Sequence, residues 1–383
     1  MEPEQQYSQQ AEPLAAPAAE APPAAPAPAR RGAAWVFFGP NGLRAGWSVL
    51  MFVVLLVFFG LLVGFVFVKF HLFNPKSTDF TAGQTFFTEL LQLLPIIGAA
   101  AVVGLVEHRR ILDYNLRGPR PAKRFVSGLV AGFIALSVLI AALAVGGFLH
   151  FGPIALSGAA IFRSGALWGC VFLLVGCTEE GLFRCYLLFT LSRGINFWWA
   201  LGVVAAVCLD LAMRAKGQGP WGVYAVALLG VVPCFVLYRK AVPGNGFWQA
   251  AWASSAVFGF LHTGNNGENW IGVLAAAGIG FVFCVSVRLT GSAWWAIGFH
   301  AAWDWGESYF YGTADSGLVA QGHLLTTSPA GRAFWSGGTD GPEGSFLALG
   351  VILLVALFLV VVYGRGNAQT YGSVASPAQP LAG

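Results

Sequence analysis

Long apolar runs alternate with short polar segments along most of this chain. A membrane-spanning helix needs about 20 predominantly apolar residues. Ten stretches meet or approach this length, and each is predicted to be a helix: 47–68, 86–106, 125–149, 165–191, 196–213, 221–238, 247–263, 270–288, 291–310 and 345–363. The pattern predicts an all-α, polytopic transmembrane helix bundle of about 8–10 spans. Its weakest spans are 196–213 and 221–238.

The composition agrees with a membrane protein. Of the 383 residues, 57% are hydrophobic and only 10% are charged, whereas soluble domains carry about 25% charged residues. The net charge of +4 comes from basic residues in short loops, so it bears on membrane orientation and not on nucleic acid, for which no binding is expected. The six cysteines lie in or beside apolar runs without Cys-x-x-Cys spacing, which predicts buried thiols.

The ends of the chain differ from its middle. The Pro/Ala-rich N-terminal segment is predicted to be a disordered cytoplasmic tail, and the C-terminal segment a second one. The prediction divides the chain into a tail at 1–34, N-terminal transmembrane helices at 35–164, a catalytic core at 165–310, an external loop at 311–344, a last transmembrane helix at 345–363 and a tail at 364–383.

Basic residues in the loops predict the orientation. The loop 107–124 carries six Arg or Lys residues. Under the ten-span arrangement further basic residues fall on the same side: Arg239, Lys240, Arg288 and Arg365. Three others fall on the opposite side: Arg163, Arg214 and Lys216. The excess predicts an integral, multi-pass protein of the plasma (inner) membrane with a cytoplasmic N-terminus.

The first polar site within an apolar span is "TEEGLFR", which holds Glu179, Glu180 and Arg184. Each charged side chain at the centre of a spanning helix costs roughly 2.5–3.5 kcal/mol, so a function is the default expectation. Glu180 and Arg184 stand at i,i+4 and share a helix face, which predicts an ion pair. Glu179 is rotated about 100° away and stays unpaired, as a general base requires. The alternative is a structural ion-pair network between helices.

Two further polar sites lie on later spans. His262 ends "FGFLH", with Phe258 one turn earlier; a lone histidine there is also typical of a hydrogen-bonded core residue. His300 and Asp304, in "GFHAAWDW", stand at i,i+4, where Asp can orient the imidazole or the two can form an interfacial capping pair. If the three helices pack together, their polar side chains form one pocket within the membrane. Such a pocket can activate water and stabilise an oxyanion, or bind a divalent cation through His and Glu.

The three motifs occur in a fixed order on successive apolar helices: Glu-Glu-x-x-x-Arg at 179–184, Phe-x-x-x-His at 258–262 and His-x-x-x-Asp at 300–304. This ordered set resembles the CAAX protease and bacteriocin-processing family of intramembrane endopeptidases, also called Abi or CPBP. The family is related to the type II CAAX prenyl endopeptidases. The flanking text "SSAVFGFLH" and "TGSAWWAIGFHAAWD" is also similar, over roughly 165–310.

The resemblance implies an all-helical core with its catalytic groups inside the membrane boundary. It implies that Glu179 activates water with help from His262, and that His300 and Asp304 stabilise the oxyanion or complete the pocket. The family is often labelled metalloprotease, which implies a divalent metal such as zinc on Glu179, His262 and His300. No cofactor is required if Glu and His activate the water directly.

The resemblance also implies that Glu180 and Arg184 support the catalytic groups. This chain has Asp304 where the prenyl endopeptidases have Asn, which favours a metal-binding or His-orienting role over an oxyanion role. The implied partners are the lipid bilayer and a membrane-associated peptide or protein substrate, lipidated or leader-bearing.

Two other functions fit an intramembrane polar site. A proton- or cation-coupled transporter can use the same acidic and imidazole groups as a relay, although no inverted repeat or matching broken helices are evident. A non-catalytic immunity or scaffold protein can keep the polar pocket for folding alone. We expect an endopeptidase, because two histidines and two glutamates on three apolar helices exceed what a scaffold needs.

Overall fold

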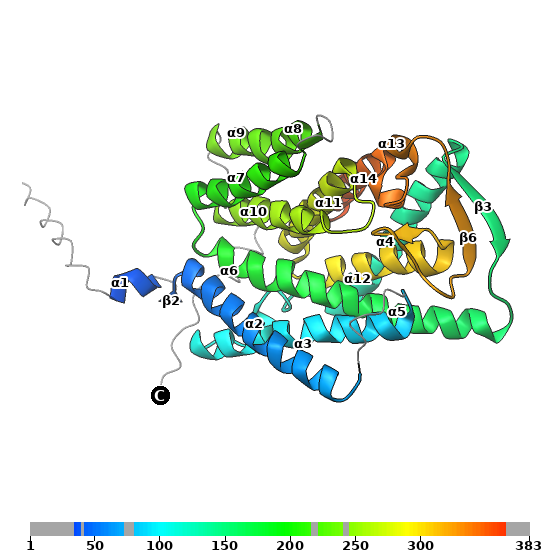
Figure 1. The fold of residues 1–383 in the computed structure, drawn as a ribbon. Coiled ribbons are helices and arrows are strands. Elements are labelled where there is room, and N and C mark those ends of the chain that lie inside the picture. The colour runs from blue at the N-terminus through cyan, green and yellow to red at the C-terminus, as the bar shows by residue number, and fades with distance from the viewer. Residues whose placement is uncertain (1–33, 40–41, 73–79, 216–220, 240–244, 365–383) are drawn as a thin grey trace, which may run out of the picture.

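The computed structural model describes residues 34–39, 42–72, 80–215, 221–239 and 245–364 (Figure 1). The two predicted disordered tails, apart from Ala34 and Gly364, lie outside these residues. Helices dominate the described chain, as predicted, and β-structure is confined to three short two-stranded sheets.

Seven helices are long and apolar enough to cross a membrane by length and composition: α2 Ala45–Lys69, α3 Ala82–Val106, α4 Pro121–Val145, the continuous stretch Ala159–Ser192, α7 Phe197–Arg214, α11 Trp270–Thr290 and α14 Phe346–Tyr363. The stretch Ala159–Ser192 consists of α5 Ala159–Glu180, a π-helix η2 Gly181–Leu187 and α6 Leu188–Ser192. The predicted transmembrane helix bundle is therefore present.

The other three predicted spans are helical but do not number among these seven. The predicted span 221–238 corresponds to α8 Trp221–Val226 and α9 Val232–Arg239, which are joined by the π-helix η3 Ala227–Val231. The span 247–263 corresponds to α10 Asn245–His262. The span 291–310 corresponds to α12 Trp294–Asp304 with the π-helix η4 Trp305–Tyr311. Short helical segments complete the fold: α1 Ala34–Phe37, η1 Ile111–Asp113, α13 Ala333–Ser336 and η5 Pro342–Gly344.

Helix α12 lies at the centre of the bundle, between α4 and α5 (Figure 1). Gly128 and Gly132 form a Gly-x-x-x-Gly pair on α4, and a Cβ at either would lie 2.2 Å from a backbone carbonyl of α12. Gly298 of α12 makes the reciprocal approach to α4, and Gly176 of α5 approaches Ile297. Small residues let membrane helices pack at backbone contact. These contacts fix the position of α12 relative to both neighbours.

The predicted external loop 311–344 is structured. It contains β4 Ala314–Asp315, β5 Leu318–Val319 and β6 Leu325–Pro329. Strand β6 pairs antiparallel with β3 Leu149–Ile154, which lies between two predicted spans; Leu149 faces Pro329 in the register. The remaining strands, β1 Phe38–Gly39 and β2 Gly42–Leu43, form a hairpin before α2. The loop is thus held on the bundle next to the carboxyl end of η4.

Candidate active site

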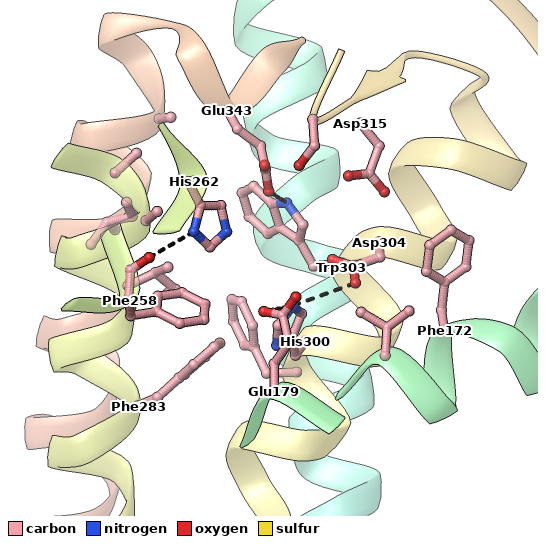
Figure 2. Close-up of a pocket in the computed structure, with 18 of the residues that line it drawn as sticks. Phe172, Glu179, Phe258, His262, Phe283, His300, Trp303, Asp304, Asp315 and Glu343 are labelled. Atoms are coloured by element: carbon pink, nitrogen blue, oxygen red, sulfur yellow. Dashed lines mark hydrogen bonds and ion pairs between the residues drawn. The ribbon is translucent and has the colours of Figure 1, made fainter. Parts of the chain in front are cut away.

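A cavity of about 210 Å³ lies between the helices and beneath the 312–345 loop, the segment that connects η4 to α14 (Figure 2). Glu179 of α5, His262 of α10, and His300 and Asp304 of α12 all line it. The structure therefore brings the three sequence motifs to one site, while the roles predicted for these residues remain predictions.

His300 connects α12 to α5. Its Nδ1 donates a hydrogen bond to Oε1 of Glu180 over 2.9 Å. Its Nε2 lies 3.7 Å from Oε2 of Glu179 and 3.5 Å from Oδ2 of Asp304. One ring nitrogen is therefore fixed by a buried partner, and the other faces the cavity between two carboxylates (Figure 2).

Glu180 and Arg184 form the ion pair that their spacing predicts, at 3.2 Å between Oε2 and Nε. Their side chains are 0% and 1% exposed, so the pair is sealed from the cavity, whereas the side chain of Glu179 is 34% exposed. The guanidinium stacks over the ring of Phe258 at 4.2 Å. A Cβ at Gly280 of α11 would lie 2.7 Å from Arg184 Nη2, so this glycine provides the space for the guanidinium.

Two of the three chain segments that carry catalytic candidates change to a π-helix at the site. α5 becomes η2 directly after Glu180, and α12 becomes η4 directly after Asp304. Single π-turns within α-helices are frequent at functional sites because they redirect side chains and free backbone groups. In η2, the carbonyl of Arg184 accepts a 2.7 Å hydrogen bond from Nδ2 of Asn115, which comes from the segment after η1.

His262 faces the same cavity from the last turn of α10 (Figure 2). Its Nδ1 lies 2.8 Å from the carbonyl oxygen of Phe258, so Nδ1 carries the proton and donates it. In the neutral ring Nε2 is then an acceptor. Phe258 contacts both His262, at 4.7 Å between ring centroids, and Arg184, which explains the one-turn spacing of the Phe-x-x-x-His motif.

Sequence reasoning missed other polar residues of the cavity, among them Glu89 of α3, Asp315 of β4 and Glu343 of η5. Glu89 is a lone acid in an apolar span, and this signal was available in the sequence. Asp315 and Glu343 belong to a polar loop, in which an acidic residue is unremarkable, and only the folded loop brings them to the site. Trp303 Nε1 donates to Glu343 over 2.7 Å and to Glu307 over 3.0 Å.

The loop carboxyl groups have raised pKa values. Burial, and next the charges of Asp315 and Asp340, raise the pKa of Glu343 to about 8. Burial also raises the pKa of Asp315, against a hydrogen bond from Ser308 that lowers it. The loop side of the cavity therefore carries more acidic groups than its surroundings neutralise.

The three predicted zinc ligands, Glu179, His262 and His300, all line the cavity. Within the described ranges, no group of three or more His, Cys, Asp or Glu side chains is placed to hold a metal ion. His262 and His300 each use Nδ1 for a hydrogen bond within the protein. A zinc ion on Glu179, His262 and His300 stays a prediction, which elemental analysis of the purified protein tests, and no reaction step is derived through it.

Comparison with known families identifies part of this site. Residues 236–306 match the family described as "Type II CAAX prenyl endopeptidase Rce1-like". This stretch is an Rce1-like domain of the CPBP family. It contains α10, α11 and α12, and with them His262, His300 and Asp304. No curated protein and no solved structure gave a significant match.

The matched domain supplies the histidines but not Glu179, Glu180 or Arg184, which precede it in the chain. The structure brings α5 against α12 through Gly176, and His300 then bonds to Glu180. The chain is therefore a multi-pass membrane protein, by helix length and apolarity, that carries an Rce1-like domain, and this domain points to a CAAX-type endopeptidase with a protein substrate.

Proposed function

We propose that this protein is an intramembrane endopeptidase that hydrolyses a peptide bond of a membrane-associated substrate. Glu179 and His262 activate the water. The observation that supports this proposal best is the shared cavity, in which a carboxylate on α5 and an imidazole on α10 face the same space (Figure 2). The Rce1-like domain at 236–306 adds independent support for peptide-bond hydrolysis.

Glu179 suits the base because its side chain lines the cavity and, among the described residues, its ion-pair contact is with His300, at 3.7 Å. It accepts one proton from a water molecule, whose oxygen forms a bond to the scissile carbonyl carbon. His262 faces the same water with Nε2, since Nδ1 is committed to the carbonyl of Phe258. When the C–N bond breaks, the proton is returned to the leaving amine.

We assign His300 to stabilise the carbonyl oxygen of the scissile peptide bond, on which negative charge develops when water attacks. Its Nδ1–H is held by Glu180, and in the doubly protonated ring, which the carboxylates of Glu179 and Asp304 stabilise, Nε2–H is directed into the cavity as a second donor. A preorganised donor at this position stabilises an oxyanion more strongly in a low-dielectric site than in water. Asp304, 3.5 Å from Nε2, orients the ring, in agreement with the Asp in place of Asn. The ion pair between Glu180 and Arg184 fixes the carboxylate to which Nδ1 of His300 donates.

An unbiased comparison of peptide termini tests this proposal. Membrane fractions of cells expressing the wild-type protein or Glu179→Gln are compared for new N-termini by mass spectrometry. The proposal predicts a set of new termini in membrane-associated proteins that is present with the wild type and absent with the variant at equal expression. Identical sets of termini for both proteins would overturn it. Asp210→Asn on α7 serves as the control and should match the wild type.

A further inference from the structure

The cavity wall contains more acidic than basic groups. Five carboxyl groups line it: Glu89, Glu179, Asp304, Asp315 and Glu343. Among the described residues of the cavity wall, the basic side chains are the two histidines, and there is no Lys or Arg. The nearby Arg184 is sealed beneath the wall and already paired with Glu180, so it adds no net charge.

The histidines do not balance these carboxylates. His300 offers one nitrogen to both Glu179 and Asp304, so even its protonated form neutralises one of the two. His262 uses Nδ1 on a neutral carbonyl. The three remaining acids, Glu89, Asp315 and Glu343, accept hydrogen bonds from neutral donors or face the cavity without a cation.

Asp304 gives a second, independent observation. It is 6% exposed and its carboxylate points into the cavity (Figure 2). Within the described part of the chain it accepts no hydrogen bond, and its nearest charged neighbour is His300 at 3.5 Å. A carboxylate that is this deeply buried requires a donor or a cation in the space in front of it.

Asp315 and Glu343 place the same sign of charge on the loop side of the cavity. Each already accepts one neutral hydrogen bond, from Ser308 and Trp303 respectively, at 2.7 Å. Their raised pKa values agree with a wall that lacks a compensating positive charge. A cationic group that enters between the loop and α12 would meet Asp304, Asp315 and Glu343 together.

We propose that the cavity selects a substrate segment with a lysine or arginine side chain beside the scissile bond over a segment with an acidic side chain at this position. This inference rests on the proposed peptidase function, and it concerns the substrate class of that same site. In a low-dielectric cavity, opposite charges attract and like charges repel far more strongly than in water. Repulsive contacts of this kind generate specificity as effectively as attractive ones.

Binding of designed peptides tests the inference without relying on cleavage. Each fluorescent peptide has an apolar anchor of about 20 residues and a Gly/Ser segment that carries one Lys, Gln or Glu at successive positions. Affinity is measured on ice with the purified full chain in phosphatidylcholine nanodiscs, which carry no net lipid charge. We expect Lys to bind about tenfold more tightly than Gln at one or more positions, and Glu more weakly than Gln.

The double variant Asp315→Asn, Glu343→Gln isolates the loop charges. Both new amides still accept the hydrogen bonds from Ser308 and Trp303, so the loop keeps its contacts. The preference for Lys should fall to about twofold in this variant, and it should persist in the control Asp113→Asn, which lies outside the cavity wall. Added salt should weaken the preference in the wild type, a readout that does not depend on any variant.

Two outcomes would overturn the inference: equal binding of the Lys, Gln and Glu peptides at every position, or a Lys preference that the double variant retains in full. Neither outcome bears on the peptidase proposal, which the comparison of termini for Glu179→Gln tests separately. Conversely, a Lys preference without any cleavage would support the cation-binding site and contradict the peptidase function.

Discussion

Nδ1 of His300 donates a hydrogen bond to Oε1 of Glu180, although 120 residues separate the two. Glu180 also pairs with Arg184 through its other oxygen at 3.2 Å. One buried carboxylate therefore joins α5 to α12 and holds the imidazole that faces the cavity.

The substitution Glu180→Gln should destabilise the protein. Its amide oxygen still accepts from His300, but Arg184 loses its counter-charge while it remains 1% exposed. Breaking a buried pair by removing one partner costs about 3–5 kcal/mol. Thermal unfolding in nanodiscs should show a clearly lower midpoint. Asp210→Asn, which removes the exposed i,i+4 pair with Arg214 on α7, is the matched control and should cost about 1 kcal/mol or less. Equal shifts for both variants would contradict the assigned role.

Gly280→Ala should disturb the site through one added methyl group. The new Cβ would lie 2.7 Å from Nη2 of Arg184 and 3.2 Å from the ring of Phe258. Overpacking of this kind costs about 1–3 kcal/mol. Gly278→Ala, on the same helix, meets Ile352 at an ordinary 3.7 Å and is the control. Unfolding midpoints should fall for the first variant and not for the second; an unchanged midpoint for Gly280→Ala would count against the described packing of Arg184.

His262→Gln should reduce cleavage strongly while the fold is retained. The glutamine cannot act as a base towards water, and general acid–base groups typically contribute about 10²–10⁴-fold to a rate. His323 is the matched control, because its Nδ1 bonds to the Ala320 carbonyl in the same manner and it lies outside the cavity wall. Initial rates on one substrate should fall for His262→Gln and remain near wild type for His323→Gln. Equal rates for the two variants would remove His262 from the mechanism.

The stability of the 312–345 loop should fall as the pH rises. Burial raises the pKa of Glu343 from 4.5 to about 8 and, with Glu268 as the next cause, that of Asp340 from 3.8 to about 9. The folded state therefore holds protons that the unfolded state has released, so stability declines with rising pH from about 4 to about 9. Unfolding midpoints measured across this range should decrease, with a shallower slope for Glu343→Gln. A midpoint that rises with pH would show that the sign is wrong.

Local spacing was sufficient to predict part of the site. The i,i+4 positions of Glu180 and Arg184 predict their ion pair, and the apolar runs predict the helices that carry them. The bond from His300 to Glu180 could not be predicted, because it depends on how α12 packs against α5 through Gly176. No local pattern encodes such a helix–helix contact, since it joins segments more than a hundred residues apart.

The loop was predicted least well. Its Gly, Ser and Thr content indicated irregular structure, yet β6 pairs with β3 over a register that starts at Leu149 and Pro329. Strand pairing between distant segments is fixed by tertiary contacts more than by propensity. Asp315 and Glu343 therefore gave no signal as site residues, although Glu89 did, as a single acid within an apolar span.

Cleavage of one purified substrate by the wild type and by Glu179→Gln shows whether Glu179 is the general base of the reaction. The side chains of glutamate and glutamine are nearly equal in size, so the variant keeps the shape of the cavity and removes only the base. We predict a loss of about 10²–10⁴-fold or more in the cleavage rate, with an unfolding midpoint like that of the wild type. A Glu179→Gln protein that cleaves the substrate at the wild-type rate would contradict it.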